Sequence, residues 1–314
     1  MARESKLPKH LQPMLATLID APFDDAQWVF EEKWDGFRMV AEIRNGKVTL
    51  YSRNGKIVSD RYKPVAEALE AMGHEAVVDG ELVALDRHGI SRFQLLQNAL
   101  RTTATLRYCV FDIMALDGEN LRDLPLTERK SRLKAVLPRS NLLAFSEHRA
   151  EHGKRFFKEA ERKGLEGIMA KRAGSTYASG GRSRDWLKIK TGKRQEVVIA
   201  GFTAPRRSRQ YFGSLVMAVR DGRQWRYVGH VGTGFSQAAL AEIHGKLAPL
   251  CTAASPLDRR IKDEAVTTWV RPRLVAEVRF TEWTSAGEMR HPAFLGLRAD
   301  KQPEEVVMER EARR

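Results

Sequence analysis

The amino-acid sequence predicts an α+β protein of two domains, and three features of the chain support this expectation. Its 314 residues are about twice the ~150 residues of a typical domain. Over residues 1–192, strand-like runs alternate with stretches of helical periodicity, whereas residues 193–314 consist mostly of strand-like runs. A short polar stretch at 191–194 lies between two apolar runs. We therefore expect one domain over 1–192 and a second over 193–314.

The first domain is predicted to alternate between strands and helices. Strands are expected where short runs of apolar and β-branched residues occur, at 28–30, 47–51, 76–85, 107–114, 167–171 and 186–190. Helices are expected where apolar residues recur every three or four positions, at 61–72, 126–137 and 151–163. Gly73 and Gly164 directly follow the first and the third of these helices, where glycine commonly ends a helix.

The second domain is predicted to be a small β-barrel. Its expected strands are 196–203, 214–220, 224–231 and 274–283, and one helix is expected to begin at a capping Ser236 and run through Leu247. Short antiparallel strands with a single helix in roughly 100 residues are typical of the oligonucleotide-binding (OB) fold. A β-sandwich is the alternative.

Composition excludes several classes of protein. Apolar residues make up 42% of the chain and charged residues 30%, which is ordinary for a folded globular protein. The sequence contains no run of the ~18 apolar residues that a membrane span needs, and the N-terminal stretch lacks the apolar core of a secretory signal. The two cysteines, Cys109 and Cys251, cannot form a disulfide framework. We expect no membrane association and a reducing, cytoplasmic location.

The charge points to a polyanionic partner. The chain has 54 Lys and Arg against 40 Asp and Glu, a net charge of +14. Residues 1–192 hold 33 of these cations against 26 acids, and residues 193–314 hold 21 against 14, so each domain carries +7. Nucleic acid is the leading candidate for such a partner, and a basic surface that serves only solubility is the alternative. Within 206–209, three arginines form a loop that is either solvated or in contact with phosphate.

Residues 33–38 read Lys-Trp-Asp-Gly-Phe-Arg and contain the pattern K-x-D-G-x-R. One interpretation is a solvated strand edge that runs into a turn at Asp35 and Gly36. The other makes Lys33 a covalent nucleophile. An ordinary lysine, with a pKa of about 10.4, is neutral about once in 2,500 molecules at neutral pH, a deficit of about 4.6 kcal/mol. A nucleophilic lysine therefore needs neighbouring cations, a metal ion or desolvation.

Other charged residues of the first domain could meet this need. Lys188 and Lys190 share one face of a predicted strand and lie about 7 Å apart, a spacing that suits a phosphate. The alternative is an edge strand whose lysines hinder aggregation. Glu81 and Glu166 each lie in an apolar stretch, where a carboxylate is either paired structurally or binds a hard cation such as Mg²⁺. No P-loop, G-x-G-x-x-G motif or zinc-spaced Cys and His set is present.

The order of the motifs suggests a family. K-x-D-G-x-R is followed by Ser52-Arg53-Asn54-Gly55, Asp79-Gly80-Glu81, Phe111-Asp112, Glu166-Gly167-Ile168-Met169-Ala170-Lys171, Leu187-Lys188-Ile189-Lys190 and Arg298-Ala299-Asp300-Lys301. This series resembles that of covalent nucleotidyltransferases, specifically ATP-dependent DNA ligases. The stretches LPLTERK at 124–130 and HPAFLGLR at 291–298 look most like the ligase module of bacterial ligase D, the end-joining ligase. The resemblance covers about residues 10 to 301.

This resemblance implies a fold and a nucleophile. Residues 1–192 would form a nucleotidyltransferase (ATP-grasp-like adenylation) domain with antiparallel sheets and flanking helices, and residues 193–314 would form an OB-fold DNA-binding domain. Lys33 would attack the α-phosphate of ATP, expel pyrophosphate and hold AMP as a phosphoramidate. Lys188 and Lys190 would bind the α-phosphate and keep Lys33 neutral enough to react.

The resemblance also implies a nucleotide and metal site. Glu31 would contact the adenine and Phe111 would stack on it. Glu166, with Glu81, would hold the divalent ion, Mg²⁺ or Mn²⁺. Arg38 and Glu81 would contact the ribose and nearby DNA or phosphate groups, and Arg53 would bind a phosphate. In the barrel, Arg298, Asp300 and Lys301 would contact ATP and its leaving pyrophosphate. Lys171 receives no definite role.

The implied function is the sealing of nicks in double-stranded DNA in repair by non-homologous end joining. Two alternatives remain: an RNA ligase or GTP-using capping-type nucleotidyltransferase, and a non-catalytic DNA-binding repair scaffold. The implied partners are nicked duplex DNA and, by analogy, Ku and the polymerase and phosphoesterase modules of end joining. We expect a monomer that acts at the nucleoid.

Overall fold

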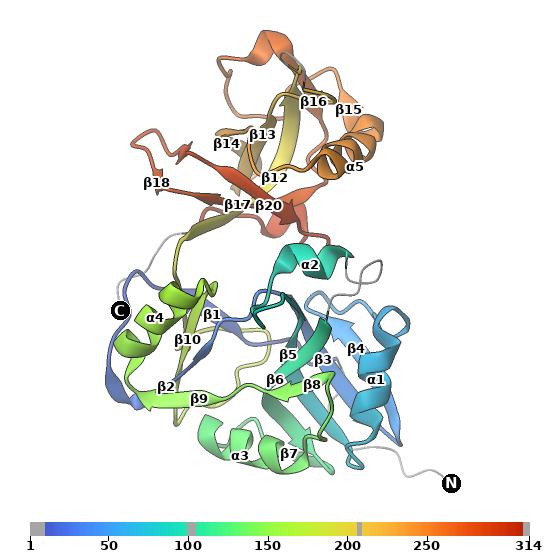
Figure 1. Cartoon of the computed structure of the whole chain (residues 1–314), viewed down its shortest axis with the longest axis vertical. Helices are drawn as coiled ribbons and strands as arrows, with labels where there is room; N and C mark the ends of the chain where they lie inside the picture. The colour runs from blue at the N-terminus through green and yellow to red at the C-terminus, as the bar shows by residue number, and fades with distance from the viewer. Residues whose placement is uncertain (1–9, 99–104, 206–208, 310–314) are drawn as a thin grey trace. The chain divides into compact units, whose positions relative to one another are not determined.

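The computed structural model describes residues 10–98, 105–205 and 209–309 (Figure 1). The chain divides into two compact units between Thr191 and Gly192, next to the expected boundary. Residues 206–208 of the predicted contact loop at 206–209 lie outside the described residues. Within the described residues, no helix is long and apolar enough to cross a membrane. Cys109 is buried and Cys251 exposed, both as free thiols.

The first unit contains two sheets. The five-stranded sheet has the order β1-β11-β10-β2-β9 and comprises β1 (Leu15–Leu18), β2 (Asp25–Glu32), β9 (His148–Glu151), β10 (Gly167–Arg172) and β11 (Arg182–Lys190). The six-stranded sheet has the order β4-β3-β5-β6-β7, with β8 paired to β6, and comprises β3 (Phe37–Arg44), β4 (Lys47–Ser52), β5 (Ala76–Leu85), β6 (Thr105–Leu116), β7 (Glu119–Asn120) and β8 (Leu143–Phe145). All pairs are antiparallel except β1 with β11 and β6 with β8.

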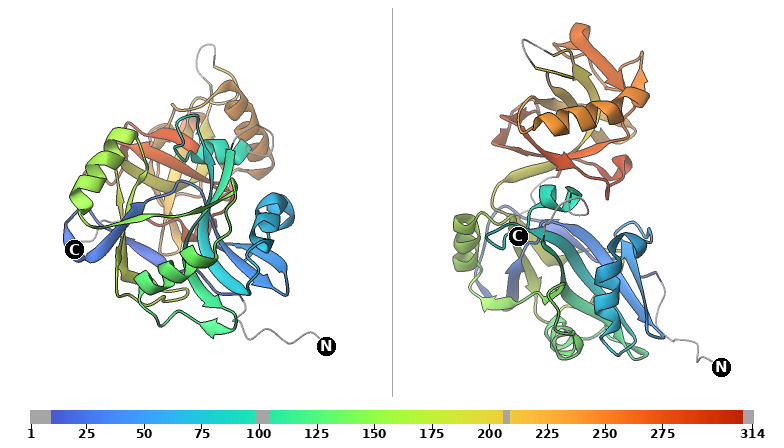
Figure 2. Two further views of the ribbon diagram at one scale, coloured as in Figure 1. Left: turned by 60° about the horizontal axis from the view of Figure 1, so that its bottom comes forward. Right: turned by 45° about the vertical axis from the view of Figure 1, so that its right-hand side comes forward.

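The two sheets bury a common core between them. Val29 of β2 and Trp186 of β11 pack with Val40 of β3 and Phe111 of β6 in one apolar cluster. Because side chains alternate along a strand, Phe30 and Ile189 point to the other face of the five-stranded sheet, where they pack with Ala160 of α4 (Gly153–Lys163). Figure 2 shows α4 on the outer side of these strands. The candidate site residues of this sheet alternate with the residues that face α4.

Three other helices complete the first unit. They are α1 (Lys63–Glu70), α2 (Phe93–Asn98) and α3 (Leu126–Val136), and Leu69 of α1 and Leu96 of α2 belong to the apolar core on the outer face of the six-stranded sheet. The helix predicted at 151–163 begins two residues late, because residue 151 pairs with Asp25 in β9 and has a positive φ of 67°. The helix predicted at 61–72 is shorter, because a 3₁₀ turn precedes it.

Among the described residues, the second unit contains a curled, seven-stranded sheet, a two-stranded sheet and one α-helix. β12 (Lys193–Thr203) pairs with β17 (Val275–Phe280) along its first half and with β16 (Thr267–Val270) along its second half. The register shift between Ile199 and Gly201 marks its bend. A bridge between Thr233 and Ala293 joins the segment that follows β14 (Gln224–Val231) to β20 (Ala293–Leu297). The sheet thus closes towards a barrel, as predicted, and the β-sandwich alternative is wrong.

The remaining elements of this unit follow the expected order. They are β13 (Leu215–Asp221), β14 (Gln224–Val231), α5 (Gln237–Leu247), β15 (Cys251–Thr252), β16 (Thr267–Val270), β17 (Val275–Phe280), β18 (Glu282–Trp283), β19 (Met289–Arg290) and β20 (Ala293–Leu297). Ser236 caps α5, as predicted, by accepting a hydrogen bond from the Ala239 amide at 3.2 Å. The strand predicted at 274–283 is divided into β17 and β18.

Candidate active site

The K-x-D-G segment is a turn that contacts strands of both sheets. The Lys33 amide donates to the Gly167 carbonyl at 3.1 Å and extends the pairing of β2 with β10. The Asp35 amide donates to Ser91 Oγ at 3.1 Å. A Cβ at Gly36 would lie 2.1 Å from the Leu82 carbonyl oxygen of β5, so only glycine fits there. With Asp35 7% exposed, the interpretation as a solvated strand edge is wrong.

Two rows of residues cross the inner face of the five-stranded sheet. In one row, Glu31 of β2, Met169 of β10 and Lys188 of β11 are direct neighbours. In the other, Gly167 lies between Lys33 and Lys190. Because strands are ~4.8 Å apart, the two rows place the nucleophile candidate, two cations and a carboxylate within one small area. The pairing of β11 on both sides also excludes an exposed edge strand as the role of Lys188 and Lys190.

Glu166 faces Lys33 directly. Lys33 Nζ lies 2.5 Å from Glu166 Oε1, and the two side chains are 16% and 5% exposed. The Glu166 carbonyl accepts a hydrogen bond from the Thr191 amide at 3.1 Å, so the residue is fixed between β10 and the end of β11. A Cβ at Gly167 would lie 2.1 Å from the Ile189 carbonyl oxygen, which explains the glycine next to this carboxylate.

Glu31 forms ion pairs with two buried lysines. Its Oε1 lies 2.9 Å from Lys130 Nζ of α3, and its Oε2 lies 2.9 Å from Lys171 Nζ of β10. All three side chains are at most 2% exposed. Burial alone would raise the pKa of the Glu31 carboxyl, but the two ammonium groups outweigh it and lower that pKa. Glu31 is therefore a fixed carboxylate.

Lys171 of this group also packs against two aromatic rings, those of Phe111 and Trp186. Lys171 Nζ is 4.3 Å from the ring centre of Phe111 and 4.2 Å from that of Trp186. Burial lowers the pKa of Lys171 to about 8, helped by Lys130 and opposed by Glu31. The structure thus gives Lys171 a definite position as the cation between Glu31 and the Phe111 ring, which the sequence did not.

Arg38 is held by an acid that the sequence analysis did not select. Its Nε and one Nη lie 2.5 and 2.6 Å from the two oxygens of Asp79, which is fully buried. The guanidinium also lies 4.5 Å from the Phe111 ring centre. Burial would lower the pKa of Arg38, but Asp79 outweighs it and raises that pKa. Glu81 is the direct partner of Arg38 across β3 and β5, and the Arg53 amide donates to the Arg38 carbonyl at 3.1 Å.

The residues present fit a nucleotide and a divalent ion. No group of three or more His, Cys, Asp or Glu within the described segments is arranged to hold a metal by itself. Glu166 nevertheless offers a hard oxygen donor that already accepts a cation, the Lys33 ammonium, and such donors suit Mg²⁺ when phosphates supply further ligands. Lys33, Lys188 and Lys190 line the same face, as a polyphosphate requires.

In the second unit, the motif residues Arg298, Asp300 and Lys301 form one ion-pair network. Arg298 donates to both Asp300 oxygens at 2.9 and 2.8 Å, and Lys301 Nζ lies 2.9 Å from Glu196 Oε1. Burial opposes the effect, but Lys301 and Arg298 lower the pKa of Glu196 to about 2. Glu196 is a second acid that the sequence analysis missed.

The last residue of the predicted contact loop is held by the barrel itself. Arg209 donates to the Gly232 carbonyl at 2.6 Å.

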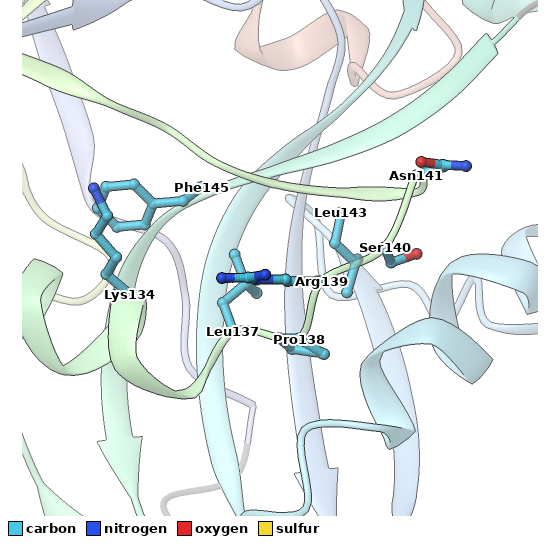
Figure 3. Close-up of a pocket in the computed structure, with 8 residues that line it drawn as sticks. All are labelled: Lys134, Leu137, Pro138, Arg139, Ser140, Asn141, Leu143 and Phe145. Carbon is cyan, nitrogen blue, oxygen red and sulfur yellow. The ribbon is translucent and has the colours of Figure 1, made fainter.

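One hollow of the first unit lies apart from the candidate site residues. Figure 3 shows its lining, which comes from the end of α3 and from the chain that leads into β8. Lys134 on its rim is paired with Glu147 at 2.7 Å and lies 5.1 Å from the Phe145 ring centre. Its volume is about 620 Å³. It contains none of the motif residues.

Lys130 is the missed residue with the clearest signal in the sequence. Leu126, Arg129, Lys130 and Leu133 follow the i, i+3, i+4, i+7 spacing of a buried helix face. Two charged residues at core positions indicate buried ion pairs, because isolated charges are not buried. Both residues are indeed at most 1% exposed.

A lysine set in K-x-D-G-x-R, faced by a buried carboxylate and flanked by two strand lysines, is the arrangement that the sequence led us to expect of a nucleotidyltransferase. Comparison with known families agrees. Residues 13–190 match the ATP dependent DNA ligase domain, and residues 208–301 match the ATP dependent DNA ligase C terminal region. The chain belongs to the ATP-dependent DNA ligase family, as the motifs predicted.

Named relatives and solved structures agree with this assignment. The chain is 38% identical to the multifunctional non-homologous end joining protein LigD of Pseudomonas aeruginosa, over 98% of this chain and 38% of that protein. It is 31% identical to a DNA ligase of Thermococcus fumicolans, over 95% of this chain and 57% of that one. Mycobacterial DNA ligase D complexed with ATP and MES matches with a TM-score of 0.73 and 38% identity, over 95% of this chain and 98% of that one.

These matches confirm a nucleotidyltransferase core with an OB-fold unit. The family implies ATP and a divalent metal. The chain spans about two fifths of the length of the LigD protein it matches.

Proposed function

We propose that this chain seals nicks in duplex DNA through a covalent AMP on Lys33. One observation carries the proposal: Lys33 lies 2.5 Å from Glu166 and shares one face of the sheet with Lys188 and Lys190. A non-catalytic DNA-binding scaffold has no use for a nucleophile candidate placed between an acid and two cations. We therefore assign the activity to an enzyme and not to a scaffold.

In the first step, the neutral amine of Lys33 attacks the α-phosphorus of ATP and pyrophosphate leaves. Lys188 and Lys190 neutralise the α-phosphate, and Glu31, Lys171 and Phe111 form the end of the site that receives the adenine. When bound, the divalent ion supplies Lewis-acid stabilisation of the phosphate charge. Glu166 would hold that ion, and its carboxylate would then no longer be available to favour the charged form of Lys33.

In the next two steps, AMP passes to the 5′-phosphate of the nick, and the 3′-hydroxyl displaces it. Both are displacements at phosphorus in which the protein positions groups and neutralises charge. Arg38, Arg53 and Glu81 are the residues of the six-stranded sheet and its β4 turn that we assign to ribose and phosphate. We assign Arg298, Asp300 and Lys301 of the second unit to the pyrophosphate of the first step.

The test is self-adenylation followed by sealing. Purified protein is incubated with α-radiolabelled ATP and Mg²⁺ or Mn²⁺, and nicked duplex is then added. We expect label on the wild type, none on Lys33→Ala, and sealed product only with the wild type. Labelling by GTP instead, or sealing restricted to RNA nicks, would identify the capping or RNA-ligase alternative. Salt-sensitive duplex binding without any label would identify the scaffold.

We further propose that the physiological substrate is a broken DNA end. The support is the likeness to proteins named for non-homologous end joining. On this proposal the chain acts as a monomer at the nucleoid, with Ku and the polymerase and phosphoesterase activities of end joining as partners. Stimulation of sealing by purified Ku on linear DNA, compared with a pre-formed nick, tests this partnership.

A further inference from the structure

The outward face of α4 carries a stripe of positive charge. Lys154, Lys158 and Arg162 are four residues apart, so they lie above one another on one side of the helix. Arg155 stands beside them with its side chain 79% exposed. Phe156 and Ala160 point to the opposite side and pack against the five-stranded sheet. The cations therefore face away from the core.

The acids nearby do not neutralise this stripe. Asp24 uses an oxygen to accept the Lys154 backbone amide at 2.9 Å, and Glu159 is shared between Arg149 at 2.7 Å and Arg155 at 3.4 Å. The part of the chain that the structure describes offers no ion-pair partner for the ammonium and guanidinium groups of Lys154, Lys158 and Arg162. Three cations without an ion-pair partner in the described part of the chain thus remain on one helix face, beside the exposed Glu161.

The stripe borders a hollow of about 540 Å³, lined by Asp24, Lys154, Arg155, Lys158, Glu159 and Arg162. A concave surface that presents several cations suits an anion with more than one negative group. Five of the six lining residues belong to α4, which lies on the outer side of the sheet (Figure 2), whereas Lys33, Lys188 and Lys190 lie on the inner face. A nick bound at Lys33 cannot place the same phosphates in this hollow.

The surface lacks what a protein partner would need. Protein interfaces depend on buried aromatic and apolar anchors, and the large hydrophobic residues that are exposed among the described residues, Ile57, Tyr211, Val266 and Val307, are not on α4. A phosphate backbone needs only cations at regular spacing. The observations therefore favour duplex DNA over an acidic protein.

We propose that the outward face of α4 is a second DNA-binding surface, which contacts the phosphate backbone of duplex through Lys154, Lys158 and Arg162, apart from the segment held at Lys33. The proposal rests on the proposed function, since it takes DNA as the substrate. With this surface, the nucleotidyltransferase unit binds a second stretch of duplex. That is useful when two DNA ends have to be held together.

The test compares two triple variants that lose the same charge. The first is Lys154→Gln, Lys158→Gln and Arg162→Gln, and the matched control is Lys47→Gln, Arg61→Gln and Lys63→Gln, which are also exposed in the first unit. Binding of intact duplex is measured by fluorescence anisotropy at several salt concentrations. We expect the α4 variant to lower the slope of log K against log salt by about 2 to 3, because each lost phosphate contact removes about 0.9. The control should keep the wild-type slope.

Two further measurements separate this surface from the catalytic site. Single-turnover sealing at saturating enzyme should be the same for the wild type and the α4 variant, because the chemistry occurs on the other face. Bead-bound nicked DNA, saturated with enzyme, should retain a labelled second duplex with the wild type and lose it with the α4 variant. An unchanged salt slope, or equal loss in the control, would overturn the proposal.

Two other outcomes are also decisive. If the α4 variant keeps duplex affinity but loses binding of a poly-glutamate probe, the surface serves an acidic protein and the DNA proposal fails. If the wild type does not seal nicks, the proposed function fails, and the comparison of duplex binding still decides the role of α4.

Discussion

Lys33 and Glu166 form an ion pair in which Nζ and Oε1 are 2.5 Å apart, although they come from opposite sides of the β2–β10 pairing. The pair joins the proposed nucleophile to the proposed metal ligand. A carboxylate so placed can hold the ammonium in the resting protein and a divalent ion in the ATP complex. On the proposed function, this one residue would couple metal binding to the release of the nucleophile.

Replacing Glu166 by Gln should therefore impair the first chemical step. Gln keeps the size of the side chain but cannot balance a divalent ion. We expect lysyl-AMP formation to slow by on the order of a hundredfold, as when a single electrostatic contributor is removed from an active site. Initial rates with radiolabelled ATP over a range of Mg²⁺ concentrations measure this change, and the melting temperature checks the fold. A wild-type rate at every Mg²⁺ concentration would refute the role of Glu166.

Lys130 offers a test of the adenine end of the site. Its Nζ lies 2.9 Å from Glu31 Oε1 and donates to the carbonyls of Ser146 at 2.8 Å and Phe111 at 3.3 Å. Lys130→Met removes this common support for Glu31 and Phe111. A hydrogen bond to a charged group is worth about 1.5 to 3 kcal/mol. We therefore expect the KM for ATP in self-adenylation to rise about tenfold or more, with a smaller change in kcat.

Lys130→Arg is the matched control, because it keeps the charge near Glu31 and should recover part of the loss. Both variants are compared below their melting temperatures, measured by circular dichroism. If Lys130→Met folds and shows the wild-type KM for ATP, Lys130 does not position the adenine end.

Asp112 and Arg129 are next in the chain to Phe111 and Lys130. We expect them to stabilise the fold and to take no direct part in the site. Two hydrogen bonds of 2.8 and 2.9 Å join them, and both side chains are fully buried. Asp112→Asn leaves the buried Arg129 charge without a counter-charge, so we expect a loss of about 3 to 5 kcal/mol in the free energy of unfolding. The double variant Asp112→Leu, Arg129→Met should recover much of that loss. Urea denaturation of the wild type, Asp112→Leu, Arg129→Met and the double variant tests the coupling, and losses of the two single variants that simply add in the double would contradict it.

The sequence predicted the elements that follow simple periodicity. The strand at 76–85 and the strand at 224–231 have the predicted bounds, because apolar runs stand at both ends of the first and apolar residues alternate with polar ones at the start of the second. β3 (Phe37–Arg44) was missed, since Arg38 and Glu42 interrupt its apolar pattern. Their burial depends on partners elsewhere in the chain, for example Asp79 for Arg38, and such partners appear only once the sheet is assembled.

The same limit applies to the candidate site. Motif spacing was enough to select Lys33, Glu166, Lys188 and Lys190, and the sheet register brings them together. It was not enough to select Lys130 or Glu196, because their contacts join segments that are far apart in the chain. The roles of the motif residues in binding ATP and DNA stay predictions.

Glu32 gives a prediction about pH. Its Oε1 is buried without a hydrogen-bond partner among the described residues. Burial raises its pKa to about 7 from 4.5, although Lys163 opposes the shift. Between these two pH values the folded protein binds more protons at Glu32 than the unfolded chain does. The contribution of Glu32 to stability is therefore complete below pH 4.5 and is lost as the pH rises to about 7.

Glu32→Gln removes this titration and should stabilise the protein progressively as the pH rises. A shift of this size corresponds to about 3 kcal/mol. We expect the difference in the free energy of unfolding between variant and wild type to move in favour of the variant by up to that amount between pH 4.5 and 7, and to stay constant above. Denaturant titrations across this range measure it, with the exposed Glu70→Gln as a control for the loss of one carboxylate. A Glu32→Gln difference that changes with pH no more than the Glu70→Gln difference does would mean that Glu32 is solvated and ionised in the folded protein.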